Sequence, residues 1–219
     1  MKAAPRLRGG LAIRLPCLFA GLVVIGVAIV IQLQIGLGLP PWDVLHQGIS
    51  LHTPLALGTA SIVVGLAVLI VAWALGQPPG FATFANAIVI GGSVDVLLRV
   101  DAFAGLAEAG IVVRVGLLLV AIAVFGIGSA LYIGAGLGAG PRDSLMLVGS
   151  HRLEVRIAIV RFSMEAIVVA IGFALGGSVG IGTLAFALLI GPSVEGSFWL
   201  LARIGLADLP DLEDAGPVL

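Results

Sequence analysis

Long segments without a charged residue constrain the fold of this chain more than any other feature. Three of them cover residues 44–94, 115–141 and 166–194. Hydrophobic residues make up 60% of the sequence and charged residues only 11%, whereas a soluble domain carries roughly a quarter charged residues. A helix needs about 20 apolar residues to span a bilayer. The sequence therefore predicts an integral membrane protein that crosses the membrane several times.

The second half of the sequence repeats the first at an offset of 100 residues. The Gly-Leu-Gly run at 36–38 recurs at 136–138, and the Pro-x-Asp run at 41–43 recurs at 141–143. A repeat of this length predicts two copies of one structural unit. The predicted organisation is a basic cytoplasmic N-terminus (1–13), a first repeat (14–106), a connector (107–113), a second repeat (114–206) and an acidic C-terminal tail (207–219).

The apolar pattern predicts an all-α fold with six transmembrane helices, three in each repeat. The expected spans are residues 14–35, 55–75, 81–100, 112–134, 155–175 and 180–202. In each repeat the first span is followed by a turn and a segment too short to cross a bilayer. Because three is an odd number, the second repeat is expected to enter the membrane inverted relative to the first, a plan that recurs in secondary transporters.

The positions of Lys and Arg predict the orientation, because these residues concentrate in short cytoplasmic loops. If the N-terminus is inside, the outer side holds only Arg99 and Arg114. The cytoplasmic side then holds Lys2, Arg6, Arg8, Arg14, Arg142, Arg152, Arg156 and Arg203. We therefore expect both termini to be cytoplasmic.

The paired turns are the first candidate site. Glycines let the chain leave the preceding helix, and Pro41 and Pro141 suit the first position of a new helix. Asp43 and Asp143 follow two residues later, where a carboxylate can accept hydrogen bonds from free backbone N–H groups. Two interpretations are open: a capped start of a half-helix, or a half-helix that points into a cavity with its Asp exposed there. Trp42 and Arg142 complete the two motifs.

Ionisable residues inside the predicted spans are the second candidate. Such groups are costly in a bilayer and usually face the bundle interior or water. Arg161 and Glu165 lie four residues apart, a spacing that permits a salt bridge on one helix face. The pair is either a structural lock or a contact for substrate or ion.

Asp95 and Glu195 occupy equivalent positions in the two repeats. Each follows a stretch that weakens a helix, Gly-Gly-Ser in the first repeat and Gly-Pro192-Ser in the second. A carboxylate beside a broken helix can serve as a proton or cation site. The alternative is that each lies near the end of its span and meets the membrane interface.

No motif indicates a metal site, a cofactor or an enzyme. His46 follows Asp43 by three residues and shares its helical face, but two residues do not make a metal site. The single cysteine, Cys17, lies in the first span without a Cys or His cluster around it. The net charge of −1 gives no attraction to nucleic acid.

Several motifs together resemble the YczE/YyaS/YitT-type bacterial membrane proteins, and the YczE branch most closely. They are Pro-Trp-Asp-Val-Leu-His at 41–46, Gly-Pro-Arg-Asp-Ser-Leu-Met at 140–146, Val-Arg through Glu at 160–165, Val-Gly-Ile-Gly-Thr at 179–183 and Ile-Gly-Pro at 190–192. The resemblance covers about residues 14–203. It implies a multi-pass protein of the bacterial plasma membrane, in a family with members linked to antibiotic production or export and without an established enzymatic activity.

These observations favour a small secondary transporter for a polar or charged solute. The alternative is a membrane regulatory or assembly partner without transport activity. The expected partners are the lipid bilayer and a small-molecule or ion substrate, and the sequence leaves a homodimer open. The candidate substrate or ion-coupling residues are Asp43, Asp143, Arg161, Glu165, Glu195 and Asp95.

Overall fold

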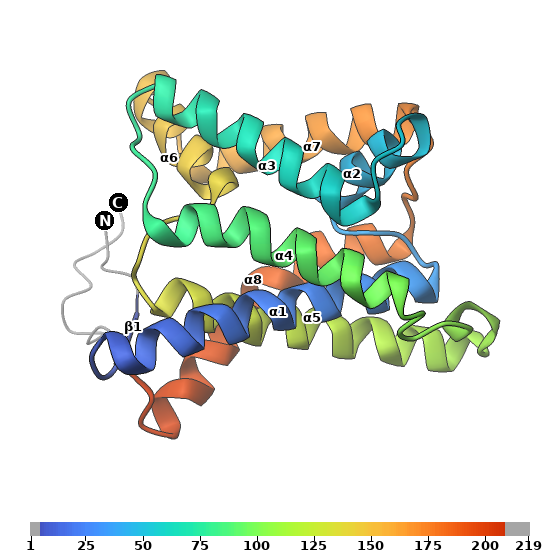
Figure 1. Ribbon diagram of the computed structural model, residues 1–219, viewed down its shortest axis with the longest axis horizontal. Helices are drawn as coiled ribbons and strands as arrows, with labels where there is room; N and C mark the ends of the chain where they lie inside the picture. The colour runs from blue at the N-terminus through green and yellow to red at the C-terminus, as the bar shows by residue number, and fades with distance from the viewer. Residues whose placement is uncertain (1–4, 209–219) are drawn as a thin grey trace.

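A computed structural model describes residues 5–208 and shows an all-α polytopic membrane fold (Figure 1). Within the described residues, six helices are long and apolar enough to cross a membrane, as predicted. They are α1 (Leu11–Ile35), α3 (Leu57–Ala74), α4 (Phe81–Arg99), α5 (Ile111–Gly134), α7 (Ile157–Ala174) and α8 (Ile181–Arg203). The inverted orientation of the two halves in the membrane stays a prediction from the sequence.

In each half, the first long helix is followed by one shorter helix at the predicted position. These short helices are α2 (Pro41–His52) and α6 (Pro141–Leu153), and each has its proline in the first turn. Gly36 directly follows α1, Gly136 lies two residues after the end of α5, and both have φ of 63°. Gly38 and Gly138 also have positive φ values. Figure 1 shows the chain turning back after α1 before α2 begins. These left-handed glycines allow the turn-back.

The remaining elements are small. A 3₁₀ turn, η1 (Leu106–Glu108), lies in the connector between the halves. Strand β1 (Arg6–Leu7) pairs antiparallel with β2 (Ala207–Asp208), and Arg8 forms a 2.6 Å ion pair with Asp208. The first two residues of the predicted C-terminal tail are thus held against the N-terminal segment. The rest of that tail, residues 209–219, lies outside the described residues.

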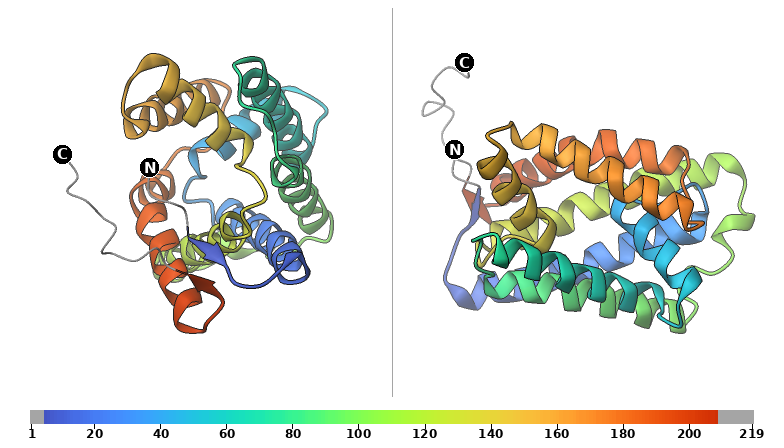
Figure 2. Two further views of the ribbon diagram at one scale, coloured as in Figure 1. Left: turned by 90° about the vertical axis from the view of Figure 1, so that its left-hand side faces the viewer. Right: turned by 90° about the horizontal axis from the view of Figure 1, so that it is seen from above.

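The core is built on the close packing of α1 against α5. A Cβ atom at Gly21 would lie 2.5 Å from the carbonyl oxygen of Gly128, so only a glycine allows this approach. Small residues are the usual means of packing helices closely in membranes. Helix α4 packs on α1 and α8 packs on α5, while α2, α3, α6 and α7 contact one another in a second group (Figures 1 and 2).

The expectation of broken helices before Asp95 and Glu195 is wrong. Helices α4 and α8 run without interruption through these stretches, and Pro192 lies inside α8. The small residues serve packing instead: Ser93 faces Gly26 on α1, and Ser193 faces its counterpart Gly126 on α5. Apart from the N–H that Pro192 lacks, a continuous helix satisfies its backbone groups internally, which is essential within a bilayer.

Candidate functional site

A cavity of about 320 Å³ lies between the two halves. The first residues of both short helices line it: Trp42 at the start of α2, and Arg142 and Asp143 at the start of α6. The long helices α1, α3, α4, α5, α7 and α8 supply the rest of the wall, which is mostly apolar. This volume lies within the range of about 300–1,000 Å³ typical of small-molecule sites.

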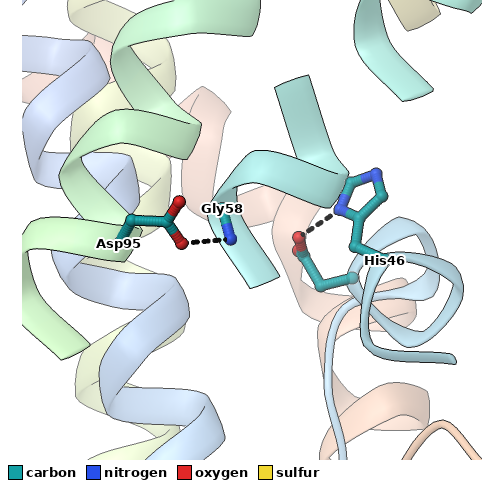
Figure 3. Close-up of polar contacts among 4 residues, drawn as sticks. His46, Gly58 and Asp95 are labelled. Atoms are coloured by element: carbon teal, nitrogen blue, oxygen red, sulfur yellow. Dashed lines mark hydrogen bonds and ion pairs between the residues drawn. The ribbon is translucent and has the colours of Figure 1, made fainter. Parts of the chain in front are cut away.

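Asp43 does not line the cavity and is hydrogen-bonded to a residue of its own helix. Its side chain is buried, and Nδ1 of His46 donates a hydrogen bond to Oδ1 of Asp43 at 3.0 Å (Figure 3). His46 is equally buried and itself lines the cavity. The shared helical face predicted for the two residues is therefore present. Within residues 5–208 the second oxygen, Oδ2, has no hydrogen-bond partner, so Asp43 does not cap the backbone as one interpretation expected.

Asp143 is held by a different partner. The hydroxyl of Tyr132, in the last turns of α5, donates to Oδ2 of Asp143 at 2.6 Å. The backbone N–H of Gly140 donates to the same hydroxyl at 3.1 Å. Tyr132 therefore ties α5 to the start of α6 and fixes the carboxylate at the cavity wall. Tyr132 was not predicted as a site residue, although it is the only tyrosine of the sequence and lies within an apolar span.

Arg142 presents its guanidinium to the cavity. It lies 4.9 Å from the centre of the Trp42 ring, so the cation stacks on the aromatic face. Such contacts are worth about 0.5–2 kcal/mol. In the part of the chain that the structure describes, Arg142 makes no hydrogen bond and no ion pair. The two motif residues that follow Pro41 and Pro141 thus meet across the interface between the halves.

Arg161 and Glu165 form the predicted salt bridge on α7. Nε of Arg161 lies 3.0 Å from Oε1 of Glu165, and both residues line the cavity. Their side chains keep 48% and 24% of their accessible surface. The equivalent residues of α3, Ser61 and Gly65, line the opposite wall. The charged pair therefore makes one wall of the cavity chemically different from the other.

Asp95 and Glu195 do not line the cavity. Asp95 is buried and accepts a hydrogen bond from the N–H of Gly58 at 2.7 Å (Figure 3). A second one comes from the hydroxyl of Thr59 at 2.6 Å, also at the start of α3. Asp95 on α4 therefore caps the start of α3. Glu195 is exposed on α8. The structure thus brings Asp143, Arg161 and Glu165 together around the cavity, with Asp43 behind His46.

The sequence pattern of a family of unknown function, DUF6198, matches residues 12–197. The chain belongs to this family. An uncharacterized protein of Haemophilus influenzae is 38% identical over 169 residues, which cover 77% of this chain and 76% of the relative. The uncharacterized membrane protein YczE of Bacillus subtilis is 33% identical over 195 residues and 83% of each chain. No solved structure matches the chain.

The DUF6198 match confirms the resemblance to YczE-type membrane proteins. It spans α1 to α7 and most of α8, and therefore every residue of the cavity described above. A multi-pass location in a membrane follows for this chain from the six apolar helices and from the relative in Bacillus subtilis.

Proposed function

We propose that this DUF6198 protein is a small secondary transporter for a polar or charged solute. One observation carries the proposal: the first turns of α2 and α6 meet at a single cavity between the two halves of the chain. Half-helices whose N-termini point at a central site are the usual way in which transporters bind a polar solute inside a bilayer.

The electrostatics of the cavity support a charged or polar ligand. The N-terminus of a helix carries a partial positive charge, and two such ends converge here. Arg142, Asp143, Arg161 and Glu165 add full charges of both signs to the wall. Charged groups at membrane depth are costly and are retained mainly where they serve a pathway or a partner.

The internal repeat supports alternating access. In transporters with inverted repeats, one half rocks against the other around a site at their interface. The cavity lies at the interface of the two halves, as this mechanism requires. We also propose that both chain ends face the cytoplasm, because the distribution of Lys and Arg favours that orientation.

A test that needs no known substrate is the accessibility of one cavity residue from both sides of the membrane. Ser61 on α3 lines the cavity, and Cys17→Ala removes the single native thiol. Ser61→Cys in that background is treated with a membrane-impermeant methanethiosulfonate, in right-side-out and in inside-out vesicles. A transporter is expected to expose the new cysteine to the reagent from both sides in turn.

Two control positions show from which side of the membrane the reagent reacts in each kind of vesicle. Ala12→Cys at the start of α1 is expected to react only from the cytoplasmic side, and Ser178→Cys in the turn before α8 only from the outer side. Both residues are exposed. If Ser61→Cys reacts from one side alone or from neither, the cavity does not alternate. That result would overturn transport and favour the regulatory or assembly role.

A further inference from the structure

The two halves of the chain differ in how their last two long helices pack. In the first half, α3 packs along α4, and the contact is made backbone to backbone where Gly58 meets Gly91. Further along the same interface, a Cβ atom at Gly65 would lie 3.2 Å from Cβ of Ala87, which is a tight contact. In the second half, the equivalent helices α7 and α8 make almost no contact within residues 5–208. Figure 2 shows this difference in its left view.

The side chains of the second half explain the separation. Where α3 has Ser61 and Gly65, α7 has the ion pair of Arg161 and Glu165, and Glu165 takes the place of the glycine that packs against α4 in the first half. On α8, Gly191 is the counterpart of Gly91. A Cβ atom there would meet nothing within 4 Å, yet Gly191 lines the cavity. The cavity therefore extends into the space between α7 and α8.

The edges of this space are apolar. Phe162 on α7 is 75% exposed, and Leu184 and Leu188 on α8 are 63% and 66% exposed. Leu188 and Leu184 lie one and two turns before Gly191, on the same face of α8. Exposed apolar side chains on a membrane helix face the hydrocarbon of the bilayer. The space between the two helices is thus bordered by surfaces that contact lipid chains.

The charges at the polar end of the cavity are of both signs. Asp43, Asp143 and Glu165 surround Arg142, but each of these carboxylates is already bonded to His46, Tyr132 or Arg161 respectively.

Arg142 itself has no such partner among the described residues, although its guanidinium is stacked on Trp42 inside the protein. All five N–H donors of the guanidinium are therefore available to a ligand. The converging N-termini of α2 and α6 also favour an anion at this place.

We propose that the cavity binds a single-chain anionic amphiphile that enters sideways from the bilayer between α7 and α8. Its acidic head group, a carboxylate or a phosphate ester, pairs with Arg142, and its chain lies along apolar wall residues such as Phe125, Phe186 and Ile190. This assignment rests on the proposed function, since it names the class of solute that the transporter carries.

The test uses the full chain in lipid nanodiscs and a palmitate analogue with a diazirine in the middle of its chain. After illumination, the labelled residues are identified by peptide mass spectrometry. The expected result is label on cavity residues such as Phe125, Phe186 or Ile190. Label confined to Phe162 and Leu188 would be that of surrounding lipid and would overturn the proposal.

Two phenylalanine substitutions on α8 test the entrance. Gly191 lines the cavity and has open space around it, so Gly191→Phe is expected to obstruct the passage and abolish labelling of the cavity. Gly196 also has nothing within 4 Å of a Cβ atom, but it does not line the cavity. Gly196→Phe is therefore the matched control and is expected to label as the native chain does. Equal labelling of both variants would overturn entry between α7 and α8.

Substitutions of Arg142 test the head-group contact. Arg142→Gln is expected to lower labelling roughly tenfold or more, which corresponds to about 1.4 kcal/mol of lost binding. Arg142→Lys keeps the charge and is expected to retain much of the labelling, which separates a binding defect from misfolding. Unchanged labelling in Arg142→Gln would overturn the role of Arg142.

Competition distinguishes the two kinds of head group. Unlabelled palmitate that displaces the probe better than hexadecyl phosphate indicates a carboxylate, and the reverse order indicates a phosphate ester. A dimer that covers α7 and α8 would exclude the probe altogether and overturn the proposal. Failure of labelling together with two-sided reactivity of Ser61→Cys would remove this class of solute and leave transport itself standing.

Discussion

The carboxylate of Asp95 accepts a hydrogen bond from the backbone N–H of Gly58 at 2.7 Å, so that α4 caps the start of α3. The hydroxyl of Thr59 donates to the second carboxylate oxygen at 2.6 Å. The free N–H groups at the start of a helix need such acceptors. At the equivalent places in the second half, α7 has Ala158 and Ile159, and Ile159 offers no hydroxyl. The capping contact is therefore specific to one half.

Removal of the Asp95 carboxylate is expected to destabilise the fold. Asp95→Ala leaves the N–H of Gly58 and the hydroxyl of Thr59 without their acceptor, and an unsatisfied buried group costs about 1–3 kcal/mol. Glu195→Ala is the matched control, because Glu195 is exposed, and its effect is expected within about 0.5 kcal/mol. Thermal denaturation of the purified variants in detergent measures both. Equal losses of stability would show that Asp95 has no special capping role.

The close approach of α3 and α4 predicts a second asymmetry between equivalent positions. A Cβ atom at Gly91 would collide with the carbonyl oxygen of Gly58, whereas one at Gly191 would meet nothing within 4 Å. Gly91→Ala is therefore expected to cost about 1–3 kcal/mol, since overpacking forces backbone shifts. Gly191→Ala is expected to be neutral or slightly stabilising, because Ala is the better helix former.

The melting temperatures of Gly91→Ala and Gly191→Ala test whether the two helix pairs pack differently. If Gly191→Ala destabilises as much as Gly91→Ala, then α7 and α8 are packed together in the membrane as α3 and α4 are. The proposed side entrance would then be closed in the resting protein.

Much of the fold was predictable from local sequence. The six long helices follow from long apolar segments with few charged residues, and the short helices from Pro41 and Pro141. The Arg161–Glu165 pair was predictable because its spacing of four residues places both side chains on one face of any helix. Each of these features depends on residues that are close together in the chain.

Other features depend on packing between distant segments and could not be predicted. Asp95 and Glu195 look equivalent in the sequence, but Asp95 finds its partner 37 residues away at Gly58. The Gly-Gly-Ser stretch before Asp95 suggested a broken helix, yet Gly91 lets α4 approach α3, and Ser93 packs against Gly26 of α1. The meeting of Trp42 with Arg142 likewise joins the two halves across the cavity.

Loss of the Tyr132 hydroxyl is expected to affect both stability and the cavity wall. Tyr132→Phe leaves Asp143 without its 2.6 Å donor and the N–H of Gly140 without its acceptor. The expected cost is about 1–3 kcal/mol in the free energy of unfolding. The interaction energy between the Tyr132 and Asp143 side chains is obtained from a double-mutant cycle of Tyr132→Phe with Asp143→Asn. Additive effects of the two substitutions would contradict a direct bond between the side chains.

Arg114 is expected to stabilise the turn that leads into α2. Its Nε donates to the carbonyl oxygen of Ile35 at 2.7 Å, and a terminal nitrogen donates to that of Gly36 at 3.1 Å. These carbonyls at the end of α1 have no partner within the helix, and a cation also interacts favourably with the negative helix end. Arg114→Gln is therefore expected to lower stability by about 1–2 kcal/mol.

Arg99 is the matched control for Arg114, because it lies at the same predicted outer side and is exposed. Arg99→Gln is expected to change stability by less than about 0.5 kcal/mol. Hydrogen exchange measured peptide by peptide adds a local readout. Residues 33–40 are expected to exchange faster in Arg114→Gln than in Arg99→Gln, because the loss is confined to the turn. Unchanged exchange there would mean that the glycine turn holds its shape without Arg114.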